Sequence, residues 1–259
     1  MIIHAYLTDG FYPWGEFFLE SLRYFHKNIP VILSTRNLNN EQITNLESYG
    51  SVNVENEDLS YKKLAKRANI TLDELHKHKN QIENVHITQE SKVWKLMIAA
   101  DDRVKSVYET LKGLDGKSEH MFHIDIDMYF RARLDDMFNI IRANDISTRF
   151  RLKSKHLNRK ILISVLGFKI NDKSFKFMEE WINFIDNVKP YNRPIGYGQT
   201  SCYYAYQKLI NTNTRWGNIP QIYASPMMRT TDKIWAANTT KGKTENLKIF
   251  REDFEKIST

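Results

Sequence analysis

The sequence has little cysteine, glycine and proline, and it has no long hydrophobic run. One Cys, 10 Gly and 6 Pro among 259 residues exclude disulfide-rich, collagen-like and low-complexity proteins. Cys202 has no second cysteine for an internal disulfide and no zinc-ligand spacing around it. The longest apolar run, Ile161–Phe168, is far shorter than the roughly 20 residues of a membrane-spanning helix. The amino-terminal segment shows no secretory signal pattern, so we expect a cytoplasmic protein in a reducing compartment.

Positive charge exceeds negative charge. The chain has 38 Lys and Arg against 31 Asp and Glu, a net charge of +7, which favours anionic partners. Basic residues are concentrated in Tyr61–Lys79 and in Lys233–Lys248. The first segment is typical of a solvated surface, and we also consider peripheral contact of this segment with an anionic membrane. It is nearly free of aromatic residues, so we expect no nucleic-acid partner; a basic nucleic-acid-binding protein without catalysis stays an alternative.

The first 55 or so residues alternate between strand and helix patterns. Apolar runs predict strands at Ile2–Leu7, Val31–Ser34 and Ser51–Val54. Apolar residues at spacings of three and four predict helices over 17–25 and Glu41–Tyr49. This βαβαβ order indicates a parallel sheet with right-handed crossovers. The carboxyl ends of its strands then lie along one edge, where ligands bind in open α/β sheets.

The rest of the chain continues without a repeat or a linker, so we expect one α/β domain over residues 1–259. Residues 59–111 are predicted to be mainly helical. The last 50 residues are predicted to be irregular, with short strands near Arg215 and Gln221. The other predicted elements are strands at Met121–Ile126, Ser147–Leu152 and Lys160–Ile170, and helices at Lys173–Ile185 and Gln199–Leu209.

The most informative motif is the DxD pair of Asp125 and Asp127 at the end of an apolar strand. Alternation along an extended chain would place both carboxylates on one side, about 6–7 Å apart. Two carboxylates at the edge of a sheet can hold one divalent cation and leave positions open for phosphate oxygens. Chance alone gives about one such pair in a chain with this many Asp. The apolar strand before the pair, and the aromatic and arginine residues after it, distinguish it from a chance pair.

With its neighbouring segments, this motif resembles the GT-A glycosyltransferases, in particular their glycogenin-like and bacterial galactosyltransferase branch. In that family a DxD motif holds Mn²⁺ or Mg²⁺ against the diphosphate of a nucleotide-sugar. Two departures are Gly198, where the family has Asp before Gln, and Asn238, near the position of a metal-binding His. The segments that carry the resemblance are Leu134–Phe138, Ser91–Leu96, Val165–Asn171, Gly196–Ser201 and Lys233–Lys243.

The resemblance implies a single GT-A-like, Rossmann-like domain with a mostly parallel central sheet flanked by helices. Residues 1–130 would form the nucleotide-sugar-binding half, and residues 131–259 would form the acceptor side and the carboxyl-terminal tail. The implied reaction moves a sugar from a nucleotide-diphosphate donor, with a UDP-sugar favoured, to a hydroxyl of a glycan, glycolipid or glycoprotein. Retention of configuration is slightly favoured over inversion.

The same resemblance assigns roles to individual residues. Gln199 would lie beneath the sugar, and an inverting enzyme would need a carboxylate base, for which Asp232 and Asp172 are the candidates. Tyr12 or Trp14 would stack on the base, although core packing is favoured for Trp14. The implied metal ligands are Asp125, Asp127 and Asn238, and the implied donor-binding residues are Thr8, Asp9, Thr35, Arg36, Lys92, Lys95, Asp125, Ile126, Asp127, Lys241 and Lys243.

Other chemistries fit the sequence less well. A haloacid-dehalogenase phosphatase needs its DxD motif near the start of the chain and a Thr or Val two positions after the second Asp, where this chain has Tyr129. A sugar nucleotidyltransferase needs a Gly-rich, basic loop after the first strand, and Thr8–Pro13 is not such a loop. No Walker A, HExxH or GxSxG motif is present. Another DxD metal-dependent phosphoryl or nucleotidyl enzyme remains an alternative.

Overall fold

We describe a computed structural model of residues 1–259. It describes the whole chain except residues 68–69, 75–89, 190–191, 194–196 and 238–241. For Tyr61, Leu64, residues 90–101 and Lys243, it describes the backbone alone.

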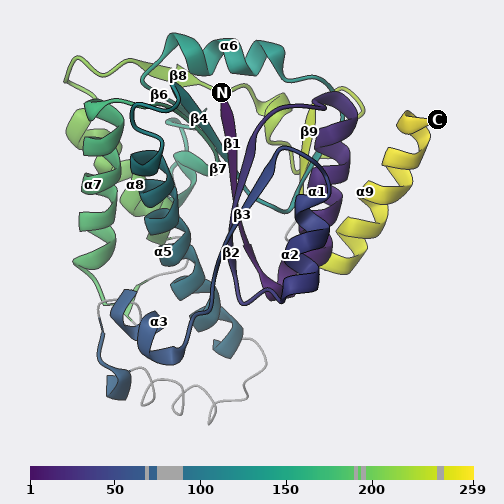
Figure 1. Cartoon of the computed structure of the whole chain (residues 1–259). Helices are drawn as coiled ribbons and strands as arrows, with labels where there is room; N and C mark the ends of the chain where they lie inside the picture. The colour runs from purple at the N-terminus through teal and green to yellow at the C-terminus, as the bar shows by residue number, and fades with distance from the viewer. Residues whose placement is uncertain (68–69, 75–89, 190–191, 194–196, 238–241) are drawn as a thin grey trace.

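A seven-stranded sheet forms the centre of the molecule, in the order β3-β2-β1-β4-β7-β6-β8 (Figure 1). Strands β3, β2, β1 and β4 pair in parallel, β7 runs antiparallel to both β4 and β6, and β8 is parallel to β6. The predicted mostly parallel α/β sheet is therefore confirmed. Its strands are β1 (Ile2–Thr8), β2 (Val31–Arg36), β3 (Val52–Glu57), β4 (His120–Ile124), β6 (Ile146–Phe150), β7 (Ile161–Lys169) and β8 (Trp216–Asn218).

Helices cover both faces of this sheet, as Figure 1 shows. One face packs against α1 (Tyr12–Phe25), α2 (Asn40–Glu47) and α6 (Asp135–Ala143). The other face packs against α5 (Glu90–Gly113), α7 (Asp172–Asp186) and α8 (Tyr197–Leu209), with α3 (Tyr61–Arg67) beside α5. No helix in the described part of the chain is both long enough and apolar enough to cross a membrane.

Close packing of α6 on the sheet depends on a glycine in β7. A Cβ atom on Gly167 would lie 2.4 Å from Cγ1 of Ile141, a distance that real Cβ atoms essentially never show. A larger residue at this position would force α6 away from the sheet. Gly167 therefore has a packing role in the segment that resembles the family's acceptor-side strand.

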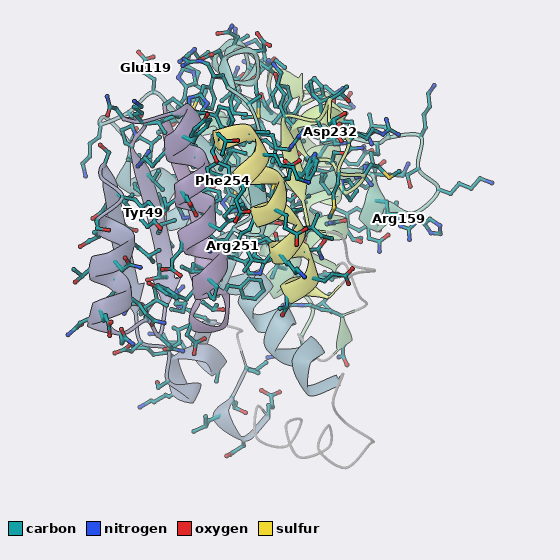
Figure 2. The ribbon with its side chains drawn as sticks, turned by 90° about the vertical axis from the view of Figure 1, so that its right-hand side faces the viewer. Tyr49, Glu119, Arg159, Asp232, Arg251 and Phe254 are labelled. Atoms are coloured by element: carbon teal, nitrogen blue, oxygen red, sulfur yellow. The ribbon has the colours of Figure 1, made fainter. Side chains whose placement is uncertain are left out.

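A two-stranded ribbon and a terminal helix complete the fold, and the sequence did not predict either. Strands β5 (Met128–Phe130) and β9 (Ile234–Ala236) pair antiparallel. Helix α9 (Lys243–Ser258) packs beside α1 (Figure 2), so the prediction of irregular structure is wrong for this part of the chain. Residues 221–223 form a 3₁₀ turn where a strand was expected.

Long-range contacts explain why α9 forms. Phe250 and Phe254 are buried against aromatic residues of α1 and of the β5–β9 ribbon, including Tyr129. Asp253 accepts hydrogen bonds from the Tyr129 hydroxyl (3.0 Å) and from Nε of Arg131 (2.7 Å). Because these partners lie more than a hundred residues away, the charged sequence of α9 alone gave only a weak helical signal.

Candidate functional site

Asp125 and Asp127 lie in the turn between β4 and β5, at the carboxyl edge of the parallel strands. The amide of Asp125 donates to the carbonyl of Ser164 on β7 (3.0 Å), and the carbonyl of Asp127 accepts from the amide of Ala237 (3.1 Å). The expectation that both residues belong to an extended strand is wrong, because β4 ends at Ile124. A turn that is fixed on both sides, not strand alternation, positions the two carboxylates.

The Asp125 carboxylate pairs with the guanidinium of Arg103 on α5. Both side chains are 21% exposed. A half-buried guanidinium at this edge is suited to bind a phosphate as well as a carboxylate. Sequence reasoning missed Arg103, because no motif connects a residue in the middle of a helix with a turn more than twenty positions away.

The chemistry of this turn fits a hard divalent cation. Carboxylate oxygens are ligands that Mg²⁺ and Mn²⁺ prefer, and Asp125 and Asp127 supply them on one short turn. Among the described residues, no group of three or more His, Cys, Asp or Glu could hold a metal. The described residues therefore place no third His, Cys, Asp or Glu ligand beside these two carboxylates. Asn238 lies outside the described residues, but Ala237, directly before it, is hydrogen-bonded to Asp127.

The residue between the two carboxylates does not face the ligand edge. Ile126 is 6% exposed and belongs to the apolar cluster beneath α1 and α6. Its side chain is therefore part of the core, and the predicted donor contact of Ile126 would have to come from its backbone at the turn.

The ends of β1 and β2 place Thr8 next to Arg36 in the parallel register. Thr8 is partly buried, and Asp9 is exposed, with its carboxylate accepting from the amide of Gly10 (2.8 Å). Both residues can reach a ligand at this edge. Thr35 cannot do so with its side chain, because it is fully buried and its hydroxyl donates to Asn56 (2.9 Å); its predicted donor contact would have to come from its backbone.

Arg36 belongs to a buried ion cluster around Asp102 of α5. Oδ2 of Asp102 accepts from Nε of Arg36 (2.7 Å) and from the hydroxyl of Tyr6 (2.7 Å), and Arg67 binds the other oxygen. Arg67 also pairs with Glu57 at 2.6 Å. Burial and the adjacent Asp102 carboxylate raise the pKa of Tyr6, so this hydroxyl keeps its proton and donates. The predicted donor contact of Arg36 is not supported, because its charge is already paired.

A cavity of about 530 Å³ adjoins this cluster. Strands β2 and β3 form its floor, and α5 forms its wall. Its lining includes Ser34, Arg36, Glu57, Arg67 and Glu109, with cations and carboxylates in similar number, and it includes neither Asp125 nor Asp127. The cavity therefore lies beside the Asp102 cluster and does not include the DxD turn.

Gln199 lies in the first turn of α8, near the same edge. A Cβ on Gly198 would lie 3.8 Å from Ile163 of β7, and the next residue, Ser164, holds the amide of Asp125. Gln199 itself is partly buried. The structure thus brings the start of α8 close to the DxD turn, as the predicted role of Gln199 requires.

The two predicted carboxylate bases lie elsewhere. Asp232 is buried in a turn, where its carboxylate accepts from the amide of Arg229 (2.9 Å). Five residues of ribbon separate it from Ala237, roughly 16 Å in extended chain, and Figure 2 shows it high on the molecule. Asp172 begins α7, beyond the end of β7 that pairs with the start of β4. The structure therefore supports neither Asp232, the predicted base, nor Asp172, the other candidate, in that role.

The structure also shows what the two aromatic residues after β1, Tyr12 and Trp14, contact. Trp14 is 4% exposed and packs edge-on against Phe250 of α9, so the preferred core assignment is confirmed. The hydroxyl of Tyr12 accepts from Nδ2 of Asn45 on α2 (2.5 Å) and donates to Glu16 of its own helix (3.2 Å). The side chains of Lys92, Lys95, Lys241 and Lys243 lie outside the described part of the structure.

Two histidines lie in the sheet beneath this site. Nδ1 of His4 on β1 is 2.9 Å from Nδ1 of His123 on β4, and Nε2 of His4 is 3.0 Å from the hydroxyl of Ser34. Burial, followed by the charge of Arg36, lowers the pKa of His4 to about 3. Burial, His4 and Arg103 lower the pKa of His123 well below its usual value. Both rings are therefore neutral in the folded protein.

This pair predicts a pH-dependent stability. The unfolded chain binds protons on these histidines below pH 6.5, whereas the folded chain binds one on His4 only near pH 3. Stability contributed by the neutral His4 ring is therefore complete above pH 6.5 and is lost as the pH falls toward 3, by about 1.4 kcal/mol per pH unit; the neutral His123 ring adds a loss in the same direction. We expect denaturant unfolding of His4→Gln to show a shallower decline than wild type from pH 6.5 to about pH 5, a range above most carboxylate titration. Parallel profiles would contradict this assignment.

The fold is shared with solved glycosyltransferases. Galactosyltransferase LgtC, in complex with donor and acceptor sugar analogues, matches with a TM-score of 0.56 at 12% identity, over 97% of this chain and 96% of that chain. Mouse xyloside xylosyltransferase 1 matches with a TM-score of 0.56 at 9% identity, over 93% and 99% of the two chains. The glycosyltransferase GlyE of Streptococcus pneumoniae matches with a TM-score of 0.58 at 10% identity; all of this chain matches 64% of GlyE.

No protein-family model and no curated protein sequence matches this chain. At identities of 9–12% the likeness shows the fold alone. The chain therefore has the GT-A glycosyltransferase fold, as its sequence motifs led us to expect.

Proposed function

We propose that this protein is a GT-A glycosyltransferase that moves a sugar from a nucleotide-diphosphate sugar, a UDP-sugar being favoured, to a hydroxyl of a glycan, glycolipid or glycoprotein. One observation carries the proposal: the Asp125–Asp127 turn lies at the carboxyl edge of the parallel strands, where ligands bind in open α/β sheets. Support comes from LgtC, which shares the fold over nearly the whole chain and whose structure holds donor and acceptor sugar analogues.

The residues at this edge have side chains that suit different roles in the proposed reaction. Asp125 and Asp127 would hold Mn²⁺ or Mg²⁺, which when bound offsets the negative charge that develops on the diphosphate. Arg103, beside Asp125, adds a fixed positive charge on the same side. Thr8 and Asp9 offer a hydroxyl and a carboxylate to the nucleoside. The contacts proposed for Lys92, Lys95, Lys241 and Lys243 with the diphosphate, and for Asn238 with the metal, rest on the family resemblance alone.

Retention of configuration is the outcome that we favour. An inverting enzyme needs a base at the acceptor hydroxyl, and neither Asp232 nor Asp172 lies at the DxD edge. Gln199 begins a helix close to that edge, and its amide can face the sugar without acting as a base. LgtC has also been solved as an active-site mutant in which a glutamine becomes a glutamate, which agrees with a glutamine near the reacting sugar.

Thermal unfolding with nucleotides tests this function. UDP, GDP, CMP and ADP are compared, each with and without Mn²⁺. A ligand at about 100 times its Kd stabilises the native state by about 2.7 kcal/mol, so we expect a clear rise in Tm with one nucleotide, UDP first, that depends on the metal. Absence of any shift at saturating nucleotide would contradict the proposal, and a shift with a different nucleotide would change the donor.

A further inference from the structure

A strongly basic loop joins β6 to β7 at the edge of the sheet that carries the candidate site. It spans residues 151–160 and contains no Asp or Glu. Figure 2 shows Arg159 on this loop, standing out from the body of the molecule. Its cations are Arg151, Lys153, Lys155, Arg159 and Lys160.

The described residues provide no carboxylate partners for these charges. In the part of the chain that the structure describes, no Asp or Glu forms an ion pair with any of the five. Nε of Arg151 is buried and has no hydrogen-bond partner among the described residues. Burial, followed by the charge of Arg159, lowers the pKa of Arg151. A cluster of like charges that includes a buried, unpartnered donor is stabilised by an anion.

The loop also exposes apolar side chains among its cations. Leu152 is 44% exposed and Leu157 is 40% exposed. Exposed leucines beside lysines and arginines are typical of surfaces that enter the interface of a bilayer. A nucleic-acid surface would instead carry exposed aromatic residues for base stacking.

The other basic segment considered from the sequence, Tyr61–Lys79, is a weaker candidate. Lys63 and Arg67 both pair with Glu57, and Arg67 also pairs with the buried Asp102. Part of the positive charge of this segment is therefore already paired with carboxylates of the protein itself. Residues 75–79 lie outside the described part of the structure.

We propose that residues 151–160 dock the protein on an anionic lipid surface. Leu152 and Leu157 enter the interface, and Lys153, Lys155 and Arg159 contact the phosphates of the headgroups. The loop ends at Lys160, four residues of β7 before Ser164, which holds the amide of Asp125; this is roughly 13 Å of strand. Docking in this way would bring a lipid-borne acceptor to the DxD edge, and only this last consequence rests on the proposed function.

Co-sedimentation with vesicles tests the docking surface. The full chain is mixed with phosphatidylcholine vesicles that do or do not contain phosphatidylglycerol. Each basic residue near an anionic surface contributes about fivefold to binding, so the triple variant Lys153→Gln, Lys155→Gln, Arg159→Gln should lose roughly a hundredfold in partitioning. Leu152→Ser with Leu157→Ser should lose at least about tenfold. The matched control removes the same charge from exposed lysines elsewhere: Lys27→Gln, Lys62→Gln, Lys66→Gln.

Several outcomes would overturn the proposal. They are equal losses in the loop and control variants, equal binding to vesicles without phosphatidylglycerol, and unchanged binding of the leucine variant. Displacement of the vesicles by inorganic phosphate, with no effect of the leucines, would indicate a phosphate site; salt-sensitive RNA binding without vesicle binding would indicate a nucleic-acid surface. Unchanged Tm and unchanged stabilisation by nucleotide show that the loop variants are folded. Asp127→Asn should bind vesicles as wild type does, which separates this test from that of the proposed function.

Discussion

Asp127→Asn is expected to remove the metal-dependent stabilisation by nucleotide and to lower sugar transfer at least about a hundredfold. The change keeps the size of the side chain and removes the charge that a divalent cation needs. The backbone carbonyl of Asp127 accepts from the amide of Ala237, directly after β9, so the turn itself should persist. The measurements are the rise in Tm with UDP and Mn²⁺, and the rate of release of UDP from the donor.

Two variants make this result specific. Asp135→Asn also removes a carboxylate, but Asp135 is 57% exposed and pairs with Arg133, so its binding and turnover should match wild type. Arg103→Met removes the cation beside Asp125 and leaves both carboxylates; it should weaken nucleotide binding and still allow a metal-dependent shift. If Asp127→Asn kept transfer within about threefold of wild type, a range too small for loss of a metal ligand, the DxD turn would not be the catalytic centre.

Local sequence patterns predicted the half of the fold in which neighbouring segments pack together. Strands β1 to β3 and helices α1 and α2 follow one another along the chain and pair in the same order in space. Their hydrophobic periodicity therefore contained enough information. The β5–β9 ribbon and α9 depend on partners more than a hundred residues away, and no local pattern reports such partners.

The same distinction applies to the candidate site. Four predicted site residues lie at or just after the ends of parallel strands: Thr8, Asp9, Asp125 and Asp127. The predicted strand ends were therefore enough to place them at one edge of the sheet. The place of Asp232 could not be predicted in the same way, because the ribbon that follows it carries the chain away from that residue before it reaches the DxD turn.

Polar residues on the α5-facing side of the sheet could not be interpreted from sequence. A parallel sheet that is covered on both faces is usually apolar on both, yet His4, Tyr6, Ser34 and Arg36 face this side and are buried. Their partners come from β4 and α5, among them Asp102. The polar groups therefore hold α5, and with it Arg103, in a fixed place over the ends of the parallel strands.

Asp102→Asn is expected to lower the free energy of unfolding by about 3–5 kcal/mol, because it leaves buried guanidinium groups without their carboxylate. The side chain of Asp102 is fully buried, and that of Arg36 is 6% exposed. Tyr6 and Arg36 share one oxygen of this carboxylate, and Arg67 binds the other. An amide has a single acceptor oxygen and two donors that would face these cations. Urea unfolding at pH 7 measures the loss.

A double variant separates the ion pair from general disturbance of the core. When Arg36→Gln is combined with Asp102→Asn, one buried cation fewer is left without its carboxylate. The double variant should therefore lose less free energy of unfolding than the sum of the losses of the two single variants, by about 1 kcal/mol or more. Additive losses would show that Asp102 and Arg36 do not interact energetically.

Because the cluster fixes α5 over the strand ends, we also expect Asp102→Asn, at a temperature where it is folded, to bind nucleotide more weakly. If the folded variant bound nucleotide as tightly as wild type, the cluster would contribute to stability alone. Other contacts of α5 would then hold Arg103 in place.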